Sequence, residues 1–227
     1  KYNHSIIQAI HTTLITSNPI IDFSIMPLSC FDNSRPHKIS FTPLFSTMTF
    51  CPYFTGIMCY NLNKPNILKS CTRMLGKNGN ISILALRNCG LIKGGKRLAT
   101  AIYSNKNIGL QYIDLSGNQI TDIDEFAKSL NYLTSKPFYL NLNGNTLNAE
   151  ATSILIRSIN ENPNLHNLTY LLANKATFTR ENLSDFAHYI NSLSEEDNKL
   201  TTLDLGRIED GSKKLFKVLA NKQVPIQ

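Results

Sequence analysis

The sequence predicts an α/β fold in which parallel strands and helices alternate along one repeating array. The first observation is recurrence: residues 81–91, 110–120 and 137–147 each fit the pattern L-x-x-L-x-L-x-x-N/C-x-L. The second is spacing, because these copies and three weaker ones begin 27, 29, 27, 31 and 32 residues apart. The third is the apolar period, which changes from strand-like to helical between copies. Together they predict a leucine-rich repeat solenoid, a horseshoe with parallel strands on the concave face and α-helices on the convex face.

The weaker copies extend the array on both sides of these three. Residues 54–64 precede them, and residues 168–178 and 200–210 follow. Between copies, apolar residues recur one helical turn apart and predict a helix in each unit. These residues are Leu68, Cys71 and Leu75, then Phe126, Leu130 and Leu133, then Leu183, Phe186, Ala187 and Ile190, and last Leu215, Phe216 and Leu219.

The beginning of the chain repeats poorly. A helical stripe is formed there by Ile6, Ile7, Ile10 and Leu14. Residues 19–28 predict a strand, and residues 29–52, with their prolines, predict an irregular unit with a long loop. We therefore expect a single array over residues 1–227, with irregular repeats in 1–52 and regular long repeats in 53–227. Neither end shows a polar capping unit, so we expect the chain to be a fragment of a larger protein.

The ninth position of the repeat is where the chain leaves the strand and turns. Asn118 and Asn145 occupy it in two copies, and Cys89 replaces the asparagine in another. An inward amide carries both donors and acceptors, so it can satisfy backbone groups that have no partner in the sheet. We expect a structural role at these positions and no contact with a ligand.

Side chains between the inward leucines should face outward over the concave surface, because strand residues alternate. The outward positions include Tyr112, Tyr139 and Tyr170 in one column of consecutive repeats. The candidate binding surface is completed by Arg87, Asp114, Asn141 and Asp204. Tyrosine offers a large contact area with a polar tip, which suits a protein partner. The alternative is that the aromatic rings only pack across strands and stabilise the sheet.

Charge is distributed unevenly in this chain of net charge +7. No Asp or Glu lies between Asp32 and Asp114, a stretch that holds eleven Lys and Arg residues. A candidate basic patch is formed by Lys69, Arg73 and Lys77 on one helix and by Lys93, Lys96 and Arg97 in the next unit. Such a field can attract an anionic membrane or an acidic protein, and the alternative is a solvated lysine-rich surface.

Catalytic and metal motifs are absent from the sequence. The five histidines are far apart, and the five cysteines lack Cys-x-x-Cys spacing, which suits reduced thiols in the cytoplasm. Residues 90–97, "GLIKGGKR", imitate a phosphate-binding loop, but Arg97 stands where Ser or Thr should hold magnesium. We expect no catalytic residue, no metal, no cofactor, no nucleic acid and no small-molecule substrate.

The order of the repeats resembles the leucine-rich repeat domain of the CARMIL family, the large actin-regulatory scaffolds. The likeness covers residues 53–205 and includes the start "YFTGIMCYNLNK", the strand end "LRNCGL" and a Lys-Pro before "YLNLNGN". It implies a horseshoe of many long repeats behind a lipid-binding domain, with dimerising and capping-protein-binding segments after it. None of these flanking parts is visible here.

The resemblance makes a non-enzymatic scaffold the first hypothesis for function. Its partners would be proteins of the actin machinery, at the cytoskeleton or the plasma membrane, with an anionic membrane surface as a second partner. The alternative is a GTPase-activating protein of the Ran-activator type, whose repeats of about 29 residues are similar. The acidic tail expected there is missing. A sensor like ribonuclease inhibitor or an immune receptor is third, because the chain is basic and has few cysteines.

Overall fold

The computed structural model describes residues 19–25, 41–64, 66–194, 198–206, 208 and 212–221. In this part of the chain, seven parallel strands form one sheet in their order along the sequence. They are β1 (Ile20–Asp22), β2 (Gly56–Tyr60), β3 (Ile83–Arg87), β4 (Tyr112–Asp114), β5 (Tyr139–Asn141), β6 (Tyr170–Leu172) and β7 (Thr202–Asp204). Each strand pairs with its neighbours in sequence, so the chain advances one strand at a time. The α/β class and the parallel strands are confirmed.

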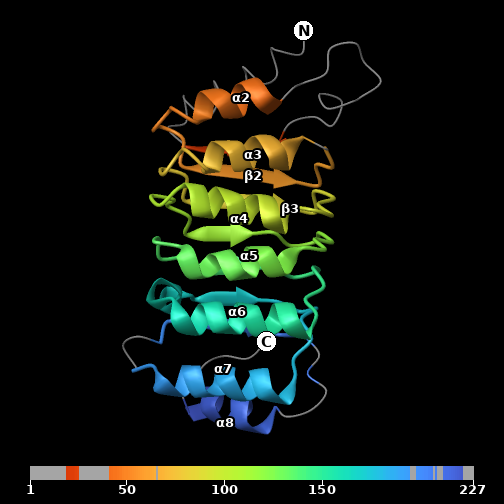
Figure 1. Ribbon diagram of the computed structural model, residues 1–227, viewed down its shortest axis with the longest axis vertical. Coiled ribbons are helices and arrows are strands. Elements are labelled where there is room, and N and C mark those ends of the chain that lie inside the picture. Colours follow the sequence, from red (N-terminus) through yellow and green to blue (C-terminus); the bar gives the residue numbers. More distant parts are fainter. Residues whose placement is uncertain are drawn as a thin grey trace.

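Helices connect the strands and stack in one column (Figure 1). They are α2 (Phe41–Met48), α3 (Ile67–Leu75), α4 (Gly95–Ser104), α5 (Ile123–Ser129), α6 (Ala149–Glu161), α7 (Arg180–Ser192) and α8 (Lys213–Asn221). Short 3₁₀ turns occur at η1 (Phe23–Ile25), η3 (Leu130–Tyr132) and η4 (Pro163–Asn167). Each described helix packs chiefly on the next one, as the sheet strands do. Within the described residues, no helix has the length and apolar character needed to cross a membrane.

The core lies between the sheet and the helices. One row of it contains a single residue from each strand, aligned by the parallel register: Ile21, Ile57, Leu84, Ile113, Leu140, Leu171 and Leu203. All of these side chains are buried in one continuous apolar cluster. Replacing one of them by alanine should cost about 2 to 5 kcal/mol, because a cavity adds to the lost burial.

Amides join each unit to the one before it. The Asn118 Oδ1 accepts hydrogen bonds from the backbone N–H groups of Cys89 (3.0 Å) and Leu91 (3.1 Å), and its Nδ2 donates to the Leu86 carbonyl (2.7 Å). Asn145 repeats this arrangement one unit later, accepting from Ile120 N–H at 3.2 Å. These are the backbone contacts that the sequence predicts for the ninth position.

The thiol of Cys89 makes the corresponding contact in its unit. Its Sγ lies 3.2 Å from the Cys59 carbonyl oxygen and 3.4 Å from that of Arg87. A thiol is a weak donor, so this unit has only weak contacts to carbonyls where Asn118 and Asn145 have an amide that both donates and accepts.

A second set of asparagines, which the sequence reasoning missed, lies at the other end of the units. Asn78, Asn105 and Asn162 are buried just beyond helices. Their Nδ2 groups donate to carbonyls of the preceding unit, at Met48 (2.6 Å), Leu75 (2.8 Å) and Leu130 (2.8 Å). Their Oδ1 atoms accept from the N–H two residues later. The signal was present as a recurring Asn-x-Asn at 78–80, 105–107 and 162–164.

The early chain is described only in part. Within the irregular unit expected at 29–52, the described residues contain α2, with Pro43 in its first turn, where a missing N–H is tolerated. Of the expected strand at 19–28, the structure describes only Ile20–Asp22 as extended. The helical stripe from Ile6 to Leu14 lies outside the described residues.

Candidate functional site

Three tyrosines form a column on the face of the sheet that is turned away from the helices. Tyr112 pairs in register with Tyr139, and Tyr139 pairs with Tyr170. The first two rings are stacked, with centroids 4.1 Å apart and an angle of 6° between planes. The second pair is tilted, at 5.5 Å and 43°. Tyr170 keeps 38% of its surface exposed, so the column ends in an accessible ring.

Asp114 and Asn141 lie beside this tyrosine column. They were expected to be accessible to a partner, but the structure buries them. Their side chains are only 3% and 8% exposed. The Asn141 Nδ2 donates to the Tyr139 hydroxyl at 3.1 Å and lies 3.4 Å from Asp114 Oδ2, while Asp114 Oδ1 accepts from Ser116 N–H at 2.8 Å. The strand alternation was right, but neighbouring side chains cover these short residues. They position the tyrosines from below.

The Tyr112 hydroxyl of the column is kept neutral. Burial first, and then the neighbouring Tyr139 and Asp114, raise the pKa of Tyr112 well above its usual value. A neutral phenol can both donate and accept a hydrogen bond. Tyr112 therefore contributes an aromatic ring with a polar, uncharged tip to the column.

The two remaining residues of the candidate surface lie at its edges. Arg87 is exposed at the end of β3 and pairs in register with Tyr60. At the far end, Asp204 Oδ2 accepts from Asn143 Nδ2 at 2.9 Å. The sheet face thus presents tyrosines in its middle, a cation on one side and a carboxylate on the other.

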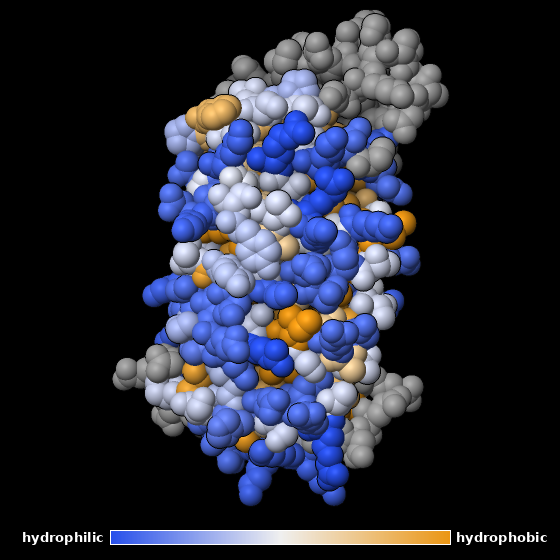
Figure 2. All heavy atoms as spheres, in the orientation of Figure 1, coloured by the Kyte–Doolittle hydropathy of each residue, from blue (hydrophilic) through white to orange (hydrophobic). Residues whose placement is uncertain are grey.

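The basic residues gather on the helix side. Lys69 and Arg73 are exposed on α3, whereas Lys77, expected on the same helix, is exposed in the turn just after α3 ends at Leu75. Lys96 and Arg97 are exposed in the first turn of α4, with Lys93 in the loop before it. Figure 2 shows hydrophilic residues over this region of α3 and α4. The structure therefore places four of the six predicted residues on two adjacent helices and the other two, Lys77 and Lys93, in the segments next to these helices.

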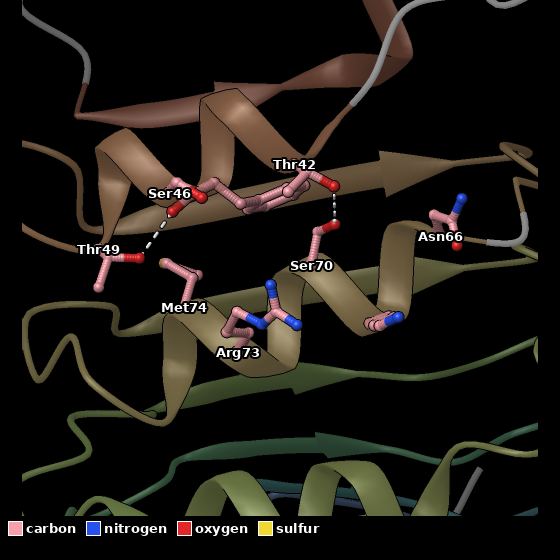
Figure 3. A pocket seen from close by; sticks show the side chains of 9 residues that line it. Thr42, Ser46, Thr49, Asn66, Ser70, Arg73 and Met74 are labelled. Atoms are coloured by element: carbon pink, nitrogen blue, oxygen red, sulfur yellow. Dashed lines mark hydrogen bonds between the residues drawn. The ribbon is translucent and has the colours of Figure 1, made fainter.

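Three depressions border this basic patch. The α2–α3 pocket, of about 240 Å³, is lined by Lys69 and Arg73 with hydroxyl groups from α2, and Figure 3 shows Arg73 rising from α3 into it. The α3–α4 groove, of about 330 Å³, contains Lys69, Arg73, Lys77 and Arg97. A third pocket of about 330 Å³, which we call the amino-end pocket, lies by the amino ends of α3 and α4. Lys69 lines all three.

The loop that imitates a phosphate-binding motif is already occupied by a carboxylate from the next unit. Asp122 Oδ1 accepts from the N–H groups of Gly94 (2.8 Å) and Gly95 (3.0 Å), and Oδ2 accepts from that of Lys96 (2.9 Å). Burial alone would raise the Asp122 pKa, but these hydrogen bonds outweigh it and lower the pKa below its ordinary value. A nucleotide phosphate would have to displace this cap, so the motif is structural.

Thiols in the core are poor candidates for chemistry. Cys59, Cys71 and Cys89 are buried and free, and burial raises the pKa of Cys89 to about 11. A protonated buried thiol is a weak nucleophile. Within the described residues, no three His, Cys, Asp or Glu side chains are grouped to hold a metal ion.

No protein-family model matches the chain, and no curated protein matches it either.

Proposed function

We propose that the chain is a leucine-rich repeat horseshoe that serves as a non-enzymatic scaffold for other proteins. In this proposal the sheet lines the concave side and the helices lie on the convex side. The regular strand order and the asparagine contacts between units support it. The proposal assigns no catalytic residue, cofactor or metal to the chain.

The tyrosine column carries the proposed binding role. Its rings are held in place by stacking and by Asn141 below, so little side-chain freedom remains to be lost on binding. Aromatic anchors of this kind contribute strongly to protein interfaces. The stacked rings also stabilise the sheet. However, Tyr170 is the most exposed of the three rings, and this exposure favours contact with a partner.

The resemblance to CARMIL proteins gives the proposed setting. The partners would belong to the actin machinery, in the cytoplasm at the cytoskeleton or the plasma membrane, where the family regulates capping protein. The basic patch would then face anionic lipid, because positive charge near a membrane surface attracts it. Activation of a Ran-type GTPase is the second candidate, on the same repeat architecture.

The binding role can be tested by substituting one exposed tyrosine on the sheet face and one on the helix face. Purified chain is titrated with capping protein and with actin filaments, using the wild type, Tyr170→Ala and Tyr103→Ala. Tyr103 is the matched control, because it is exposed on α4 and packs edge-on against Tyr132. We expect Tyr170→Ala to weaken binding about tenfold, which corresponds to about 1.4 kcal/mol, and Tyr103→Ala to leave it unchanged.

The competing activity is measured in the same preparation. GTP hydrolysis by Ran and other small GTPases is followed with and without the chain. Clear stimulation would refute the scaffold proposal and favour the GTPase-activating one. Equal loss of binding in Tyr170→Ala and Tyr103→Ala would instead contradict the assignment of the sheet face.

A further inference from the structure

The amino-end pocket collects positive charge from three separate segments. Lys69 belongs to α3, Lys93 to the loop after β3, and Arg97 to α4, and all three line the same space of about 330 Å³. None of these side chains has a hydrogen bond or ion pair with another residue that the structure describes. Their ammonium and guanidinium donors are therefore free to bind something else.

No carboxylate neutralises these charges, either among the residues that line the pocket or close to them in the sequence. The pocket lining contains no Asp or Glu, and residues 33–113 contain none. Asp122, from the following unit, uses both oxygens on backbone N–H groups at the start of α4. Like charges held close together repel each other, so an anion bound among them gains from all three.

Neutral donors complete the lining. The amides of Asn63 and Asn66 border the pocket, together with the loop at Gly90. Gly90 has a φ of +65°, and a Cβ added there would lie 2.6 Å from the Asn63 Cγ. The missing side chain therefore lets the Asn63 amide lie close against the loop. Pockets of about this volume are large enough for a small polar ligand.

We propose that the amino-end pocket binds a phosphomonoester group carried by a small polyol, with Arg97 as the planar donor and Lys69 and Lys93 as point charges. A second phosphate would reach the α3–α4 groove, which shares Lys69 and Arg97 with the pocket. The inference rests on the proposed contact of the basic patch with anionic lipid, and it assigns that contact to one pocket within the patch. The same group can come from a lipid headgroup or from a free inositol phosphate.

The test compares two lysines that carry the same charge on the same patch. Lys93 lines the amino-end pocket, whereas Lys77 lines only the α3–α4 groove. Both are exposed, so Lys93→Gln and Lys77→Gln should fold normally, which circular dichroism melting verifies. With soluble inositol 1,4,5-trisphosphate in a calorimetric titration, we expect saturable binding that Lys93→Gln weakens about tenfold and Lys77→Gln about twofold or less.

Vesicles then separate the two sources of the ligand. Phosphatidylcholine vesicles containing a phosphatidylinositol bisphosphate are compared with phosphatidylserine vesicles of equal total charge. Preference for the bisphosphate, lost in Lys93→Gln, supports the pocket with a lipid source. Binding of soluble trisphosphate without vesicle binding supports the pocket and removes the membrane contact from the proposed function.

The proposal is overturned by either of two results. One is equal binding to both vesicle types together with no binding of the trisphosphate, which would mean a diffuse basic surface that still supports membrane contact. The other is equal weakening by Lys93→Gln and Lys77→Gln, which would mean that only total charge matters.

Discussion

At the scale of single residues, polar side chains bind the backbone of a neighbouring unit. Asn118 and Asp122, four positions apart, both bond to the unit before them, one at its strand end and the other at its helix start. The repeat pattern predicts the asparagine, because that position has a fixed place in the turn. It does not predict Asp122, whose partner lies 26 to 28 residues earlier and is defined only once the units are stacked.

Asp122 should make stability depend on acid pH. Its pKa is lowered in the folded state, so its contribution is fully present above the unfolded value of about 3.8 and is lost as pH falls through the folded value. Asp122→Asn removes the charge, and near neutral pH it should lower the free energy of unfolding by about 1 kcal/mol, as for a weakened cap. Urea unfolding of both proteins from pH 7 to pH 3 measures the difference.

The difference between wild type and Asp122→Asn should shrink as the pH falls below 3.8. A constant difference over that range would show that the carboxylate charge plays no part. Asp124→Asn, two residues later and in the first turn of α5, serves as the charge-matched control.

At the scale of elements, the leucine pattern located strands better than it located helix ends. Alternation placed Tyr112, Tyr139 and Tyr170 on one face, because a one-residue slip would move every apolar side chain out of the core. The alternation could not predict that Asp114 and Asn141 would be buried. Burial on the outer face of the sheet depends on which aromatic side chains lie next to a residue. For the basic residues, spacing placed Lys69 and Arg73 on one helix but also placed Lys77 there, although α3 ends at Leu75. Only the structure shows the pockets that these residues line.

Asparagines beyond the helices should stabilise the stack of helices. Asn105 is buried and donates to the Leu75 carbonyl, at the end of α3, while Asn107 is exposed and bonds through its backbone. Asn105→Ala should lower the free energy of unfolding by about 1 to 3 kcal/mol, because it leaves a buried carbonyl without a partner. Asn107→Ala is the matched control and should cost less than about 0.5 kcal/mol. Equal midpoints in urea would contradict the role of Asn105.

At the scale of the whole molecule, each unit contacts mainly the next one. The strongest element contacts join neighbours such as β2 with β3 and α4 with α5. In such an array, stability is a sum of unit and interface terms, so damage should remain partly local. The sheet follows the order of the strands along the chain, from β1 to β7.

Leu140→Ala tests how far a defect spreads. Leu140 is buried in the aligned apolar row between Ile113 and Leu171, and its truncation should cost about 2 to 5 kcal/mol. Hydrogen exchange followed by mass spectrometry should show the largest acceleration in β4, β5 and β6 and little change in β2. Thr146→Ala, an exposed change in the same unit, is the control. Uniform acceleration across all strands would show that the array unfolds as one cooperative block.

The side-chain hydrogen bonds between units have a direction along the chain. Asn105, Asn118, Asp122 and Asn162 each serve backbone groups of the unit that precedes them, and Asn143, which accepts from Asn174 N–H, is an exception. On a ribosome, each unit would therefore emerge with unmet polar groups and be completed only by the one synthesised after it. Folding would therefore lag translation by one unit, and the most recently synthesised unit would always have the most unsatisfied polar groups.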